Sequence, residues 1–168
     1  MSKAVLISIR PEWCTMIASG EKTIEVRKTA PKIETPFNCY IYCTKSGPAV
    51  LVKPAQRIGN GLVIGEFVCD RITSFGVPYP AFMANMDKGI MEASCLSYWQ
   101  LHRYAYHDTL YGWHISDLKI YGQLKELREF KQCHKCEYHK NCFEHEYSCD
   151  GTYALSRPPQ SWCYVEEG

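Results

Sequence analysis

The stretch KAVLISIRPEWCTMIASGEKTIEVRK, residues 3–28, carries a strand, a helix and a second strand in quick succession. Val and Ile recur with alternating spacing from Lys3 to Ile9, which predicts a strand. Pro11 suits the first position of a helix, and an apolar stripe at helical spacing follows in Trp13, Met16 and Ile17. Gly20 stands where a helix end favours a left-handed residue, and Thr23 to Lys28 alternates again. These residues predict a strand–helix–strand unit with GEKTIEVRK, residues 20–28, at its second junction.

Outward from this unit, short strands dominate the chain. Runs rich in β-branched and aromatic residues predict four of them, at Phe37 to Cys43, Leu62 to Cys69, Tyr111 to Tyr121 and Ser161 to Glu166. Ser97 and Gln100 form a capping-box pattern, so we expect a helix from Tyr98 to about Tyr106. Because strands outnumber helices, the predicted class is α+β, a small β-barrel with flanking helices.

The composition fits one soluble domain. The chain has 168 residues, of which 46% are hydrophobic, enough for one core and too few for two large ones. No apolar stretch approaches the ~20 residues needed to span a bilayer, and the first apolar run is too short for a signal peptide. We therefore expect a cytoplasmic protein with no membrane partner, in a reducing compartment despite its ten cysteines.

Charge is distributed unevenly along the chain. The net charge is +1, but residues 1–60 hold nine Lys or Arg against four acids. The remaining residues hold ten Lys or Arg against fourteen acids. A face that contacts RNA is therefore expected to draw mainly on the first third of the chain.

Several segments, taken in order, resemble the ASCH domain family, a branch of the PUA-like barrels. They are SIRPEW (residues 8–13), SGEKTIEVRK (19–28), IGEF (64–67), GWHI (112–115) and QSWCYV (160–165). The resemblance covers about residues 3–130 and 157–167. It implies a PUA-like barrel with a cleft facing the helix-to-strand junction, in a superfamily associated with RNA binding and modified-base recognition. The domains expected are an ASCH/PUA-like barrel over residues 1–130, an insertion over 131–156 and a closing strand over 157–168.

Some bacterial members of this family are amidohydrolases that remove the acetyl group from acetylated cytidine with a Lys, a Thr and a Glu, and with an Arg nearby. Lys22 and Arg27 match the Lys and the Arg of that pattern. Glu25 stands in place of the Thr, which removes a hydroxyl and adds a carboxylate. Glu92, five residues ahead of Ser97, is the match by spacing to the Glu. If the protein is an enzyme, the resemblance implies Lys22, Glu25 and Glu92 as catalytic residues.

A Lys beside carboxylates and an Arg forms a polar cluster that can bind phosphate or order a water against a carbonyl. Deacylation by Lys22 requires a neutral amine, whereas nearby acids favour the ammonium form, so binding is favoured over catalysis. The ligand-binding set expected is Lys22, Thr23, Glu25, Arg27 and Arg10. The alternative is that Glu25 and Arg27, on one face of a strand, form an ion pair in solvent.

Aromatic residues are dense between residues 98 and 113, and aromatic rings can stack on single-stranded bases. The residues concerned are Tyr98, Trp99, Tyr104, Tyr106, Tyr111 and Trp113. Most of them are expected in the core, with one or two at a cleft. Trp13 is also expected in the core.

Four cysteines, Cys133, Cys136, Cys142 and Cys149, are spaced as ligands of a closed tetrahedral zinc site. His134, His139 or His145 in place of one Cys is the main variation, and disulfides, an iron–sulfur cluster or free thiols are the alternatives. Because the segment has few apolar residues, the metal is expected to be a structural Zn²⁺ that staples the insertion.

The function favoured on these grounds is binding of RNA, single-stranded nucleic acid or a modified nucleoside in a barrel cleft centred on Lys22. One rival is an amidohydrolase or a nuclease that uses the same cluster. Another is a protein-interaction adaptor with the zinc element as its contact surface.

Overall fold

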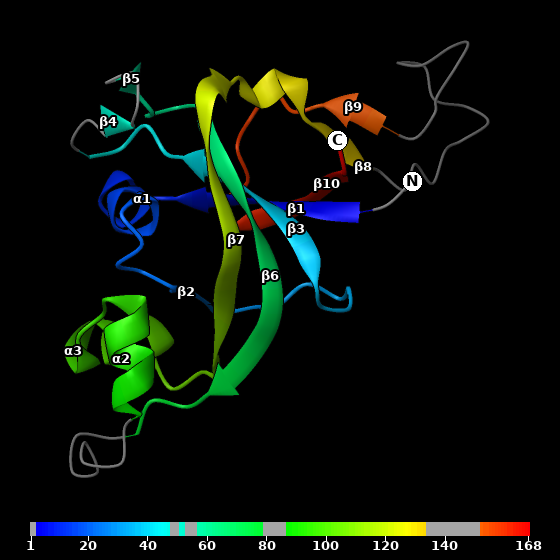
Figure 1. Cartoon of the computed structure of the whole chain (residues 1–168). Helices are drawn as coiled ribbons and strands as arrows, with labels where there is room; N and C mark the ends of the chain where they lie inside the picture. The colour runs from blue at the N-terminus through cyan, green and yellow to red at the C-terminus, as the bar shows by residue number, and fades with distance from the viewer. Residues whose placement is uncertain (1–2, 48–50, 53–56, 79–86, 134–151) are drawn as a thin grey trace.

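The computed structural model describes residues 3–47, 51–52, 57–78, 87–133 and 152–168. Figure 1 shows a strongly curved sheet, with three helices gathered to one side of its two longest strands. The helices are α1 (Pro11–Ala18), α2 (Lys88–Ser94) and α3 (Tyr98–Ala105), with a 3₁₀ turn, η2, at Leu127–Glu129. The strands are β1 (Lys3–Ile9), β2 (Ile24–Arg27), β3 (Phe37–Cys43), β4 (Leu51–Val52), β5 (Arg57–Ile58), β6 (Val63–Phe75), β7 (Leu110–Lys125), β8 (Lys131–Cys133), β9 (Thr152–Ala154) and β10 (Trp162–Glu166).

The main sheet has eight strands in the order β2-β7-β6-β3-β1-β10-β8-β9, and β4 pairs with β5 in a separate two-stranded sheet. Only the pairing of β1 with β3 is parallel among the registers of the described strands. The α+β class predicted from the sequence is confirmed. The sheet order begins at β2 and ends at β9, and these two edge strands do not pair with each other among the described residues. The pairings therefore do not show a closed barrel.

The two longest strands extend beyond their predicted ends. Strand β6 continues past Cys69 to Phe75, and β7 continues past Tyr121 to Lys125. In the added part of β6 no residue is fully buried, so the alternation of apolar residues fades. The backbone pairing nevertheless continues, with Ile72 opposite Trp113 and Phe75 opposite Leu110. Backbone hydrogen bonds therefore extend these strands where the hydrophobic pattern ends.

Strand β2 is covered on both faces. Ile24 and Val26 pack with Leu101 and other buried residues of α3. Side chains alternate across a strand, so Glu25 and Arg27 point to the opposite face, toward the main core. That core is built on β1, α1, β3, β6 and β7, and Trp113 is its largest fully buried side chain. Two charged residues of a four-residue strand are thus buried.

The segment that carries the four spaced cysteines starts and ends in paired strands. Strands β8 and β9 are antiparallel, with Cys133 opposite Thr152, and β8 joins the main sheet through β10. Cys136, Cys142 and Cys149, and the side chain of Cys133, lie outside the described residues. Within the described part of the chain, no group of three or more His, Cys, Asp or Glu side chains is placed to hold a metal.

None of the helices among the described residues is both long enough and apolar enough to cross a membrane.

Candidate functional site

The junction between α1 and β2 positions the first residue of the site. Gly20 has φ +80°, a conformation that favours glycine, and lets the chain turn back after the helix. The turn is fixed by backbone hydrogen bonds from Gly20 N to Ile17 O at 2.9 Å and from Lys22 N to Met16 O at 3.0 Å. Lys22 therefore enters the interior at a defined point just before β2.

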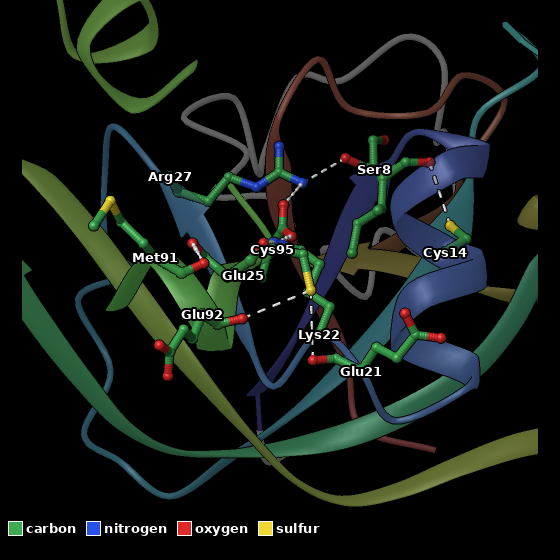
Figure 2. Close-up of polar contacts among 11 residues, drawn as sticks. Ser8, Cys14, Glu21, Lys22, Glu25, Arg27, Met91, Glu92 and Cys95 are labelled. Atoms are coloured by element: carbon green, nitrogen blue, oxygen red, sulfur yellow. Dashed lines mark hydrogen bonds and ion pairs between the residues drawn. The ribbon is translucent and has the colours of Figure 1, made fainter. Parts of the chain in front are cut away.

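Lys22, Glu25 and Arg27 form one buried ionic cluster, which Figure 2 shows between β2 and α1. The Glu25 carboxylate accepts from both cations, with Oε2 at 3.3 Å from Lys22 Nζ and Oε1 at 3.0 Å from Arg27 Nη2. The three residues are 2%, 6% and 9% exposed, respectively. The alternative of an ion pair in solvent is therefore wrong: Glu25 and Arg27 pair, but in the interior, because α3 covers the other face of β2.

The Lys22 ammonium has two further partners. Its Nζ donates to Ser94 O at 2.7 Å, at the end of α2, and lies 5.3 Å from the centroid of the Trp13 ring. A carbonyl at a helix C-terminus carries partial negative charge, and an indole face attracts a cation. Trp13 is half-buried rather than fully buried in the core, and its ring contacts the Lys22 ammonium.

The Arg27 guanidinium links β2 to the opposite side of the curved sheet. Its Nη2 donates to Ser8 O on β1 at 2.6 Å, and its Nη1 lies 3.5 Å from Ser161 Oγ, just ahead of β10. Ser8 and Ser161 also share a backbone hydrogen bond of 2.9 Å. A side chain thus joins β2 to β1, two strands that are not neighbours in the sheet.

Two nitrogen donors near this cluster are buried without an acceptor. They are Arg27 Nε and the indole Nε1 of Trp113, which is opposite Glu25 in the pairing of β2 with β7. A buried donor with no partner costs about 1–3 kcal/mol. The cluster itself holds two cations and one carboxylate, an excess of one positive charge. A negatively charged hydrogen-bond acceptor would therefore satisfy both the unpaired donors and the excess charge.

The structure places the other predicted site residues at the surface. Arg10 is the exposed N-cap residue of α1, and Thr23 is exposed, although its N–H donates to Ala93 O at 2.8 Å. Glu92 is exposed on α2, and Figure 2 shows its carboxylate pointing away from the cluster. Helix α2 thus meets the site through the backbone carbonyls of Ala93 and Ser94, while the carboxylate of Glu92 lies outside it.

Sequence reasoning missed the contributions of α2, Ser8 and Ser161. Asp87 caps α2 by accepting from Gly89 N at 2.8 Å, and Cys95 ends it with φ 55°. Asp before KGIMEAS was a usable N-cap signal, but Gly near its start and a length of seven residues weaken the helical pattern. Ser8 and Ser161 both lie in segments that carried the family resemblance.

His114, on β7 beside Trp113, gives this end of the sheet a pH-dependent contact. Arg71 Nη2 donates to its Nδ1 at 3.1 Å, so the neutral ring donates from Nε2 to Thr73 Oγ1 at 2.9 Å. Burial, followed by the charge of Arg71, lowers the pKa of His114 below its ordinary value of 6.5. The neutral ring is therefore the form that the fold stabilises.

A lowered histidine pKa makes the folded state lose stability as pH falls from above 6.5 through the folded-state value, because the unfolded chain takes up the proton more readily. We expect the stability advantage of wild type over His114→Gln to shrink between pH 7.5 and pH 5. Urea unfolding of both proteins across this range measures the effect. An advantage that stays constant or grows toward pH 5 would contradict the assignment.

A cavity of about 580 Å³ lies away from the cluster. It is lined by Tyr42, Thr44, Lys45, Gly61, Leu62, Glu126, Leu127, Arg128, Leu155, Ser156 and Pro158. None of the cluster residues contributes to it. The chemistry of the ionic cluster, rather than this open cavity, therefore defines the candidate site.

No protein-family model matches the chain, and no curated protein matches it. Solved structures do match. The ASCH protein from Zymomonas mobilis is 19% identical with a TM-score of 0.60, over 98% of this chain and 88% of that one. Its serine-to-alanine mutant is 19% identical with a TM-score of 0.60, over 98% and 89% of the two chains. Its tyrosine-to-phenylalanine mutant is 20% identical with a TM-score of 0.59, over 99% and 92%. At these identities the likeness concerns the fold, and the chain has an ASCH-like fold over nearly its whole length.

Proposed function

We propose that this protein binds a nucleotide unit, free or within a nucleic acid, with its phosphate at the cluster of Lys22, Glu25 and Arg27. The observation that supports this most is the excess positive charge of a cluster whose members are all at least nine-tenths buried. A buried charge without a counter-charge is costly. A phosphate supplies that counter-charge.

The chemistry of the donors also favours a nucleotide. A guanidinium matches phosphate oxygens with paired N–H groups, and Arg27 Nε is the donor still lacking an acceptor. The indole N–H of Trp113 supplies a second donor, suited to a carbonyl or ring nitrogen of a base. The ASCH-like fold supports the same proposal through the association of PUA-like domains with RNA and modified bases.

The contacts of Lys22 favour binding over amide hydrolysis. A general base needs a free lone pair within reach of the attacking water. Lys22 Nζ instead donates to Ser94 O and pairs with Glu25, whose oxygens each accept from a cation. The Glu92 carboxylate points away from this network in Figure 2. A hydrolytic role requires these contacts to be broken, whereas binding can keep them and add an acceptor at Arg27 Nε.

Thermal unfolding with a panel of probes tests the proposal. The panel contains the four ribonucleoside 5′-monophosphates, the matching nucleosides, N4-acetylcytidine and inorganic phosphate. A monophosphate at a hundred times its Kd adds about 2.7 kcal/mol, or roughly 5–10 °C for a chain of this size. We expect the monophosphates to stabilise more than their nucleosides. No shift with any nucleotide would contradict the proposal, and turnover of N4-acetylcytidine would favour the amidohydrolase.

We also propose that Cys133, Cys136, Cys142 and Cys149 hold a structural Zn²⁺. Besides their spacing, the pairing of Cys133 with Thr152 supports this, since it brings the two ends of the cysteine segment together. We expect one zinc per chain in purified protein, and at most a weakly held ion after any two of the cysteines are changed to Ser. Elemental analysis measures this, and purified protein without zinc would contradict it.

A further inference from the structure

Helix α3 displays large aromatic rings at the surface. Trp99 is 59% exposed, Tyr104 38% and Tyr106 78%, and they are the exposed large hydrophobic residues of the described chain. Exposed apolar side chains that occur singly need no explanation, but a group of them indicates an interaction surface. The prediction that most of the six aromatic residues lie in the core is therefore wrong: three are exposed, Tyr111 is half-buried, and Tyr98 and Trp113 are buried.

Two of the exposed rings, Trp99 and Tyr106, belong to a continuous row. The Trp99 and His102 centroids are 6.1 Å apart, His102 and His107 are 6.4 Å apart, and His107 and Tyr106 are 5.7 Å apart. Tyr98, buried beneath, stacks on His102 at 5.6 Å with an interplanar angle of 30°. We call Trp99, His102, Tyr106 and His107 the ring row. Its rings succeed one another at distances typical of aromatic contacts.

The backbone at one end of the ring row is strained. Tyr106 has φ 45° and His107 has φ 71°, two consecutive non-glycine residues in the left-handed region. Each such residue is uncommon and costs stability. Glycine at these positions would end the helix without this strain. Tyr106 and His107 instead place two rings at the end of α3.

The segment of the chain that carries the ring row contains a cation and no acid. Residues 98–107 contain Arg103 and two histidines but no acid, and Asp108 is the first carboxylate after them. Lys28 Nζ lies 5.4 Å from the centroid of the Tyr104 ring, on the same helix. Lys28 directly follows Arg27 in the chain, so the exposed surface of α3 and the ionic cluster lie on the two faces of β2.

We propose that the ring row is a stacking surface for the bases of a single-stranded nucleic acid. This inference rests on the proposed function and specifies its ligand as a strand of several nucleotides. One phosphate lies at the cluster of Lys22, Glu25 and Arg27, bases farther along the strand stack on Trp99 and Tyr106, and Lys28 and Arg103 face the phosphate backbone. Alternating rings and cations are the features by which proteins hold single strands with little sequence preference.

The test compares two probes on two proteins. Twelve-nucleotide oligouridylate spans both surfaces, whereas uridine 5′-monophosphate reaches only the ionic cluster. The variant is Trp99→Ala with Tyr106→Asn, since Asn tolerates the left-handed conformation. A lost base–ring stack weakens binding by about 5- to 150-fold. We expect the double variant to bind the oligonucleotide at least 20-fold more weakly than wild type and the mononucleotide unchanged. Trp99→Phe with Tyr106→Phe, which keeps two rings, should retain most of the affinity.

The outcomes separate this inference from the proposed function. Unchanged oligonucleotide affinity in the double variant would overturn the ring row while leaving the cluster intact. The same conclusion follows if wild type binds the mononucleotide as tightly as the oligonucleotide, or if the substitutions change only self-association in sedimentation. Wild type that binds neither probe would overturn the proposed function, and the ring row with it.

Discussion

Replacing Glu25 with Ala is expected to lower the free energy of unfolding by about 3–5 kcal/mol. The substitution removes the one carboxylate that accepts from both Lys22 and Arg27, at 3.3 and 3.0 Å. Both cations then remain in the interior without a counter-charge, and desolvation of an unpaired charge is far more costly than the loss of an ordinary hydrogen bond. Urea unfolding followed by circular dichroism measures the change.

A matched control is the exposed pair of Lys119 and Glu66, whose nitrogen and oxygen are 3.4 Å apart. The Lys119 side chain is 69% exposed, so Lys119→Ala is expected to change stability by no more than about 1 kcal/mol. A loss of less than 1 kcal/mol for Glu25→Ala, equal to that of the control, would show that the cluster is solvated and would contradict the burial argument.

The second large effect concerns binding rather than stability. In the triple variant Lys22→Met, Glu25→Leu and Arg27→Met, the buried charges are removed together. Replacing a complete buried ionic network by apolar residues is often neutral or stabilising, so we expect unfolding within about 2 kcal/mol of wild type. Binding of uridine 5′-monophosphate should weaken by about 30-fold or more, since a buried charged contact is lost. Calorimetric titration beside urea unfolding measures both quantities.

This pair of measurements distinguishes a ligand site from a structural brace. A triple variant that folds and binds the nucleotide with wild-type affinity would show that the cluster serves only to join β2 to β1. If the triple variant unfolds, the single change Arg27→Lys replaces it, because Lys keeps a cation without the paired N–H geometry. Unchanged nucleotide affinity in that variant would equally contradict the proposed site.

Much of the fold can be predicted from the sequence where the local pattern of apolar residues matches the burial of the side chains. Strands β1 and β3 have the predicted bounds, α1 begins at Pro11, and α3 begins at Tyr98 after the predicted capping box of Ser97 and Gln100. Each follows from a pattern within a few residues. Helix α2 is different: it is short and contains Gly89, and its packing against β2 is a long-range contact.

The chemistry of the site is only partly encoded in local pattern. The spacing of Glu25 and Arg27 indicates one face of a strand, but it cannot tell a solvent face from an interior one. That distinction depends on α3 covering Ile24 and Val26, and on Ser8 and Ser161 meeting Arg27 from distant segments. The partner of Lys22 on α2 is a backbone carbonyl, and no side-chain motif in the sequence predicts such a contact.

The most direct test of the central claim observes the two unpartnered donors themselves. In ¹⁵N-labelled protein, the Nε–H of Arg27 and the indole N–H of Trp113 can be assigned with Arg27→Lys and Trp113→Phe and followed by NMR as uridine 5′-monophosphate is added. We expect both resonances to shift and to saturate with the Kd found by calorimetry, because the nucleotide supplies the acceptors that these donors lack. Saturating nucleotide that leaves both resonances in place while other signals shift would contradict the claim that this cluster is the binding site.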